Sequence, residues 1–202
     1  MTKVAMLLGH DLLEPNEDNR VYREALTLVK ENYEVTVFCW ARRMDKYETK
    51  WDIEKEGIRV IRIFENLEGG FFSKVRSFRR AMKQLQSKVE EYNPKIIHAH
   101  DLETLEAAVN ASKTTKAKVI FDSHEDWPTL EIVQNWFIGK YYQRKQKQLL
   151  KKVDAVLTVS DELALRLGGG TVLYNSEPVD IVEMPVDNHR FGMDGVIAGY
   201  IG

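Results

Sequence analysis

Residues 96–125 read IIHAHDLETLEAAVNASKTTKAKVIFDSHE. A short apolar run over 96–99 leads into a helical pattern over 102–112, and a second apolar run follows at 119–121. Continuous short apolar runs separated by a helix are typical of parallel strands that are buried on both faces. The stretch therefore predicts a strand–helix–strand unit, with histidine and aspartate at the carboxyl end of each strand.

The same alternation extends over most of the chain. Further strands are predicted at 4–8, 35–40, 58–64, 155–159 and 171–174. Further helices are predicted from Asp18 or Asn19 to just before Asn32, over 71–91, over 128–152 and over 161–167. Strands that alternate with helices predict an α/β fold, here a Rossmann-like doubly wound parallel sheet.

The composition excludes several classes of protein. The 202 residues include 44% hydrophobic side chains and carry a net charge of −2, which is a globular profile and argues against a generally basic nucleic-acid binder. No apolar run approaches the ~20 residues that a membrane span requires. The single cysteine, Cys39, excludes an internal disulfide and fits a reducing compartment. We therefore expect a cytoplasmic protein.

The end of the sequence differs from the rest. Residues 175–194 hold two prolines and little periodicity, and residues 195–202 again have the pattern of a strand. We expect residues 1–188 to form one domain, and residues 189–202 to be a linker and the first strand of a further domain. On this interpretation the sequence is one half of a larger protein.

Four of the five histidines lie at the ends of predicted strands or in the turns after them, and the exception is His189. Open parallel sheets bind ligands at the carboxyl ends of their strands, near the point where the strand order reverses. If the first five predicted strands have the common order 3-2-1-4-5, then His10, His100 and His124 converge on one cleft. Asp101 directly follows His100 and belongs to the same set.

Some of these residues have simpler explanations. Asp101 and Asp161 each stand at the start of a predicted helix, so an N-cap role explains each of them equally well. His124 has acidic neighbours at positions 122, 125 and 126, and nearby carboxylates raise the pKa of an imidazole or fix its tautomer. That environment suits a general base.

A metal site is the competing use of the histidines. His98 and His100 lie two residues apart on a predicted strand and therefore face the same side. With Asp101 or His124 they would make a zinc-binding set, which is the minor alternative. No phosphate-binding glycine motif follows any predicted strand. We predict no bound metal and no cofactor.

Several segments together carry a family resemblance. They are Asp18-x-Arg20-Val21-x-x-Glu24-Ala25, Tyr33–Val37, Pro94–Asp101, Phe121–Glu125, Val153–Ser160 and Val172–Asn175. In their order and spacing they resemble the N-terminal half of retaining GT-B glycosyltransferases of family GT4. The resemblance implies transfer of a sugar from a nucleotide-sugar donor, with retained configuration, to a glycan or lipid-linked acceptor, as in cell-envelope polysaccharide biosynthesis.

The resemblance also assigns roles to residues. In the family, the histidine after the fifth strand faces the donor sugar, which makes His124 the catalytic candidate. The expected substrate-binding residues are His10, Arg20, His100, Asp101, Glu125 and Asn175. Arg20 is a candidate for contact with a phosphate or with the acceptor. Because the C-terminal domain of such enzymes holds most of the donor, we expect these residues alone to be inactive.

Two other functions stay open at this point. One is another GT-B enzyme, such as a nucleotide-sugar epimerase, and the other is a non-catalytic module that binds a glycan or a lipid carrier.

Residues 71–89 and 140–152 each carry six basic residues and no acidic one. Aromatic residues beside the basic face of 71–89 favour contact with an anionic membrane surface, so we expect a peripheral protein on the inner face of a membrane. A solvated basic face is the simpler alternative.

Overall fold

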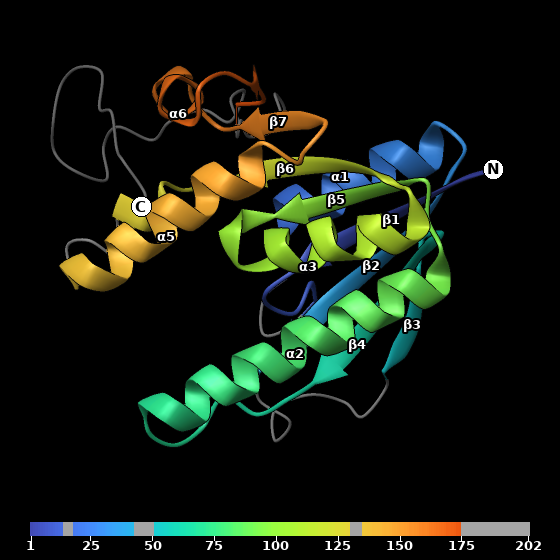
Figure 1. Cartoon of the computed structure of the whole chain (residues 1–202). Helices are drawn as coiled ribbons and strands as arrows, with labels where there is room; N and C mark the ends of the chain where they lie inside the picture. Colours follow the sequence, from blue (N-terminus) through green and yellow to red (C-terminus); the bar gives the residue numbers. More distant parts are fainter. Residues whose placement is uncertain (14–17, 43–50, 130–134, 175–202) are drawn as a thin grey trace, which may run out of the picture.

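The computed structural model describes residues 1–13, 18–42, 51–129 and 135–174. Its strands are β1 Thr2–Leu8, β2 Tyr33–Ala41, β3 Asp52–Lys55, β4 Ile58–Phe64, β5 Ile96–His100, β6 Lys118–Ser123, β7 Ala155–Thr158 and β8 Thr171–Val172. Its helices are α1 Asn19–Lys30, α2 Phe71–Tyr92, α3 Asp101–Thr115, α5 Trp136–Leu150 and α6 Asp161–Leu167. The strands form one twisted sheet with helices on both faces (Figure 1).

The sheet has the order β3-β4-β2-β1-β5-β6-β7-β8. The five central strands therefore confirm the predicted order, because β1 lies between β2 on one side and β5 on the other. Within the described chain every pairing is parallel except that of β3 with β4. The strand order reverses at β1 and β5, so the turns after these two strands flank the expected ligand position.

The antiparallel strand β3 was not predicted. It pairs with β4 so that Lys55 faces Ile58, which leaves Glu56 and Gly57 as a two-residue turn. Both have positive φ, 51° and 80°, as the favoured tight hairpin turns require. The Glu-Gly pair next to an apolar run was the available signal, and it is weaker than Asn-Gly because glutamate rarely adopts positive φ.

Two apolar layers hold the helices against the sheet. Alternate residues of β1 point to opposite faces, so Val4 and Met6 pack with α1 while Ala5 and Leu7 pack with α2, α3 and α5. Burying a large aliphatic side chain stabilises the fold by about 1.5–3 kcal/mol. The two layers fix α1 on one face of the sheet, and this face carries the polar cluster described below.

Most predicted helices are confirmed. Asp18 caps α1 by accepting a hydrogen bond from the Val21 amide at 3.1 Å, and Asn32 follows the helix with a φ of 65°. Of the predicted helix over 128–152, α5 is the described part, and residues 130–134 lie outside the described residues. The predicted strand at 195–202 and the linker before it also lie outside.

The helical spacing within α2 predicts one apolar stripe, made of Phe71, Val75, Phe78, Met82, Leu85 and Val89. This prediction is only partly correct. Met82, Leu85 and Val89 are buried, whereas Phe71 is exposed. The first turns of α2 project beyond the sheet (Figure 1), so the sheet does not cover this end of the stripe. In the described part of the chain, no helix combines the length and the apolar character needed to cross a bilayer.

Candidate active site

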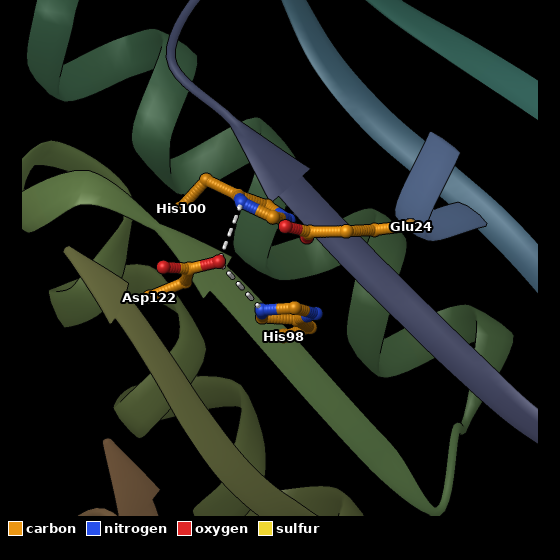
Figure 2. A group of neighbouring side chains, drawn as sticks. All are labelled: Glu24, His98, His100 and Asp122. Atoms are coloured by element: carbon orange, nitrogen blue, oxygen red, sulfur yellow. Dashed lines mark ion pairs between the residues drawn. The ribbon is translucent and has the colours of Figure 1, made fainter. Parts of the chain in front are cut away.

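A cluster of polar side chains lies between α1 and the carboxyl ends of β5 and β6. His98 and His100 share one face of β5, as predicted, and their ring centroids are 4.2 Å apart. Asp122 pairs with His100 across the strands, and Glu24 reaches the cluster from α1. Figure 2 shows both imidazoles directed at the Asp122 carboxylate, with Glu24 approaching from the helix. Neighbouring parallel strands therefore bring together residues that are more than twenty positions apart.

Asp122 is the centre of this cluster. Its carboxylate is fully buried, and its Oδ2 atom lies 3.5 Å from Nε2 of His98 and 3.5 Å from Nε2 of His124. Arg20 donates from Nη2 to both carboxylate oxygens at 3.3 Å. Burial raises the pKa of Asp122, but the hydrogen bonds with His124 and His98 outweigh it and hold this pKa far below its usual range. Asp122 is therefore ionised despite its burial.

His124 lies at the rim of the cluster. Its side chain is 20% exposed, and its Nδ1 atom lies 3.8 Å from Oδ2 of Asp101, so carboxylates face both nitrogen edges of the ring. Burial lowers the pKa of His124, but the Asp122 hydrogen bond and the charges of Asp101 and Asp122 raise it above its ordinary value. The arrangement favours the imidazolium form of His124.

The pKa of His100 is shifted in the opposite direction from that of His124. Its Nδ1 atom lies 3.4 Å from Nε2 of His124, yet its side chain is buried beneath the rim. Burial, followed by the neighbouring charge of His98, lowers the pKa of His100 well below its usual value. An imidazole that burial holds toward its neutral form thus contacts one whose carboxylate neighbours favour the protonated form. Adjacent titratable groups whose pKa values are moved apart are typical of functional sites.

Asp101 positions His124 instead of capping the helix. The side chain of Asp101 accepts a hydrogen bond from the His124 amide at 3.1 Å, and the N-cap residue of α3 is His100, without a side-chain capping bond. Asp101 has a φ of 61°, a left-handed conformation that aspartate tolerates better than most residues. Burial raises the pKa of Asp101, although the charge of His124 opposes this.

The N-cap explanation of Asp161 is also wrong. The hydroxyl oxygen of Ser160 accepts from the Leu163 amide at 3.2 Å and caps α6, whereas Asp161 lies in the first turn. Its carboxylate accepts a hydrogen bond from the Tyr174 hydroxyl at 2.6 Å. Asp161 therefore links the start of α6 to the chain that follows β8.

Arg20 is enclosed by protein groups. Its side chain is 11% exposed, and its Nε atom lies 3.1 Å from Oε1 of Glu24, one helical turn further along α1. Its Nη1 atom donates to the Leu173 carbonyl at 3.1 Å, in addition to the Asp122 contact. These partners engage both sides of the guanidinium. The structure thus places Arg20 beneath the rim and next to the chain that follows β8.

Two of the remaining predicted site residues, His10 and Glu125, lie at the rim. Nε2 of His10 lies 2.9 Å from Oδ2 of Asp18. Burial raises the pKa of Asp18, but His10 and His124 outweigh it together with the Val21 amide, so this pKa is lowered. Asp18 therefore interacts electrostatically with both histidines. Glu125 is exposed, and its carbonyl accepts from the Ser123 hydroxyl at 3.0 Å. Asn175 lies outside the described residues.

The turn after β1 is held by residues that the sequence reasoning did not single out. Arg42 donates from Nε to the Gly9 carbonyl at 2.6 Å and from Nη2 to both carboxylate oxygens of Glu103, at 3.0 and 2.9 Å. A Cβ atom at Gly9 would lie 1.7 Å from Oε1 of Glu103. Behind this turn, Asp11 and Arg62 form a buried ion pair of 2.7 Å. No local pattern reveals such pairs, because their members are 61 and 51 positions apart.

The cluster also offers metal ligands, in a different set from the one predicted. Atoms of Glu24, His98, His100 and Asp122 lie within 4.8 Å of one another, without Asp101 or His124. The guanidinium of Arg20 already lies against both carboxylates of this set. A divalent cation would have to displace Arg20 or accept its positive charge as a neighbour. These residues therefore fit an internal ion-pair network better than a metal centre.

Comparisons with known proteins agree with this fold. A sequence model described as Glycosyltransferase Family 4 matches residues 18–190. No curated protein sequence matches the chain. A sucrose-phosphate synthase from Thermosynechococcus elongatus is structurally similar, with a TM-score of 0.61, 14% identity, and coverage of 86% of this chain and 47% of that one. Another structure of this synthase has a TM-score of 0.60 and 12% identity, with coverage of 89% and 91%.

A further similar structure is described as trehalose-6-phosphate from E. coli bound with UDP-2-fluoro glucose. Its TM-score is 0.56 and its identity is 15%, with coverage of 81% of this chain and 41% of that one. The chain thus spans about half the length of two of these structures. At such identities the likeness shows a shared fold.

Proposed function

The chain belongs to glycosyltransferase family 4, and from this premise we propose that it is the acceptor-side half of a retaining transferase. The enzyme would move a hexosyl group from a nucleotide-sugar to a glycan or lipid-linked acceptor. A second domain would hold most of the donor, as the greater length of two similar structures supports. The described residues would then supply one wall of the site, and they would not transfer sugar by themselves.

The observation that carries this proposal is the position and charge of His124. It lies at the carboxyl edge, beside the reversal of strand order, where open sheets bind ligands. Asp101 and Asp122 favour its imidazolium form. A cation fixed there can donate a hydrogen bond to a hydroxyl of the donor sugar, and its charge stabilises the negative charge that develops on the leaving diphosphate. In this role His124 is a hydrogen-bond donor and not a general base.

The residues beneath the rim would position His124. Asp101 holds its backbone, and Asp122 holds its ring and its charge. We propose that Arg20 acts on the substrate through Asp122, because its guanidinium already lies against Asp122, Glu24 and the Leu173 carbonyl. His10, Glu125 and Asn175 stay proposed contacts of the acceptor or of the donor phosphate. The proposed site needs neither a metal nor a cofactor.

The test is the release of nucleoside diphosphate from a panel of nucleotide-sugars by the complete gene product, with membrane lipid extract as the acceptor source. His124→Ala is expected to lower the rate by at least about 100-fold, as is common when a preorganised transition-state donor is removed. Leu165→Ala, an exposed change on α6, is the matched control. Unchanged transfer by His124→Ala would favour a binding module, and interconversion of the donor without transfer would favour an epimerase.

We also propose that α2 contacts an anionic membrane at the cytoplasmic face. Phe71 and Phe72 are exposed at its first turn, and Phe72 is 86% exposed. A groove of about 440 Å³ runs along this end of the helix and is lined by Phe72, Val75, Arg76, Arg79, Arg80 and Lys83. An exposed aromatic pair beside a basic groove suits the headgroup region of an anionic bilayer. This contact would bring a lipid-linked acceptor to the enzyme.

A further inference from the structure

The first turns of α5 carry a second cluster of exposed aromatic side chains. Trp136 is 56% exposed and Phe137 is 78% exposed, and their rings meet edge to face with centroids 5.0 Å apart. Tyr141, one turn further on, is exposed as well. Apolar surface of this kind, gathered at one place, marks an interaction site in a protein that is otherwise well packed. Tryptophan and tyrosine are the residues that favour membrane–water interfaces.

The charge of α5 selects the kind of partner. The fifteen residues of α5 include no acidic side chain, and Lys140, Arg144 and Lys147 follow the aromatic pair. Helix N-termini carry a partial positive charge and normally attract acidic residues, as Asp101 and Glu103 do in α3. The first turns of α2 and α5 both lack acids. No acidic side chain within these turns opposes the basic residues that follow, and this charge fits an anionic surface.

The position of α5 matches that of α2. Helices of a parallel sheet run opposite to the strands, so their N-termini lie at the carboxyl edge. Figure 1 shows the first turns of α2 and α5 projecting on the same side of the molecule, the side toward which the strands point. The aromatic pair Phe71 and Phe72 and the aromatic pair Trp136 and Phe137 thus flank the edge that carries His124.

We propose that the first two turns of α5 form a second membrane anchor, which inserts Trp136 and Phe137 into the interface of an anionic bilayer while α2 occupies the same surface. This inference rests on the membrane contact in the proposed function and extends it. A single helix contact leaves the domain free to rotate about that helix. Two separate contacts fix the carboxyl edge, and His124 with it, toward the bilayer from which a lipid-linked acceptor would project.

The test is co-sedimentation of the full chain with vesicles of phosphatidylcholine alone and of phosphatidylcholine with about one third phosphatidylglycerol. The double variant Trp136→Ala/Phe137→Ala is expected to lower the partition coefficient for the anionic vesicles about tenfold or more, because two large apolar side chains leave the interface. Leu165→Ala, a change of an exposed apolar side chain on α6, is expected to leave partitioning unchanged. Thermal unfolding of each variant checks that the fold is retained.

A second measurement reports on Trp136 directly. Brominated lipids in the anionic vesicles are expected to quench part of the tryptophan emission, and Trp136→Phe, which keeps an apolar ring, is expected to remove that quenched part. If partitioning falls for Phe71→Ala/Phe72→Ala and not for the α5 double variant, the second anchor is wrong and the α2 contact stands. If the unaltered chain binds neither vesicle, or binds both equally, both membrane contacts are wrong, while nucleoside diphosphate release tests the transferase separately.

Discussion

The Nε2 atom of His124 and the Oδ2 atom of Asp122 lie 3.5 Å apart, with Asp122 fully buried and His124 reaching the rim above it. The buried member of the pair is the anion, and the charges of Asp101 and Asp122 favour the cationic form of the accessible member. An ion pair arranged in this way favours a cation at a position that substrate can reach. The predictions below follow from this pair and from the contacts around it.

Replacing Asp122 is expected to lower the pKa of His124. In Asp122→Asn the carboxylate charge is gone and only Asp101 still opposes the effect of burial, so the pKa of His124 is expected to fall toward or below its ordinary value. Titration of the imidazole ring protons by NMR measures this. The exposed pair of Asp154 with Lys118 provides the control Asp154→Asn, and an equal shift in both variants would refute the role of Asp122.

Stability is expected to depend on pH in two opposite directions. His124 has a raised pKa in the folded state, so its contribution is complete below the ordinary imidazole pKa and is lost as the pH rises through the raised value. His100 has a lowered pKa, so its contribution is present above the ordinary value and is lost as the pH falls. The free energy of unfolding, from urea denaturation, is expected to peak near pH ~6.5 in this range.

The variant His124→Gln separates the two contributions. It is expected to flatten the decrease of stability on the alkaline side of the peak and to leave the decrease on the acidic side, which His100 causes. A decrease on the alkaline side that survives in His124→Gln would contradict the assignment.

Arg62 and Arg59 are expected to differ strongly in their effect on stability. Arg62→Ala leaves the buried carboxylate of Asp11 without its ion pair, which costs about 3–5 kcal/mol. Arg59→Ala breaks the exposed pair with Asp52, which costs about 0–1 kcal/mol. Chemical denaturation of both variants measures the difference. Similar costs for both would mean that the Asp11 pair does not hold the turn after β1.

Gly9 is expected to be needed for the approach of Glu103. In Gly9→Ala the new methyl group meets the Glu103 carboxylate that Arg42 holds in place, and overpacking of this kind costs about 1–3 kcal/mol. Gly70→Ala is the control, because nothing lies within 4 Å of a Cβ atom there. In a double-mutant cycle, Glu103→Ala is expected to remove most of the cost of Gly9→Ala. Additive costs would show that the two residues do not interact.

The sequence predicted the fold well because its strongest signals are local. The apolar runs at 4–8 and 96–99 became β1 and β5, and their switch-point arrangement follows from the strand order of many doubly wound sheets. The hairpin of β3 with β4 was missed, since positive φ at Glu56 follows from pairing and not from propensity. The exposure of Phe71 was missed because periodicity shows which face a residue shares, and not where the sheet ends.

For the candidate site, the location at the sheet edge could be predicted from the sequence, whereas the buried part of the cluster could not. The sequence placed His100, Asp101 and His124 at one edge, and the structure brings these three into contact. It gave no sign that Asp122 is the buried centre or that Arg20 lies inside the cluster. Those features depend on the register of β5 with β6 and on the packing of α1, which tertiary contacts determine.

The most direct test of the central claim is the pH dependence of kcat/KM for sugar transfer by the complete gene product. If His124 acts as a cation maintained by Asp122, the rate decreases as the pH rises through the raised pKa of His124. In Asp122→Asn this decrease is expected to move to lower pH. A decrease at the same pH in both proteins would contradict the account.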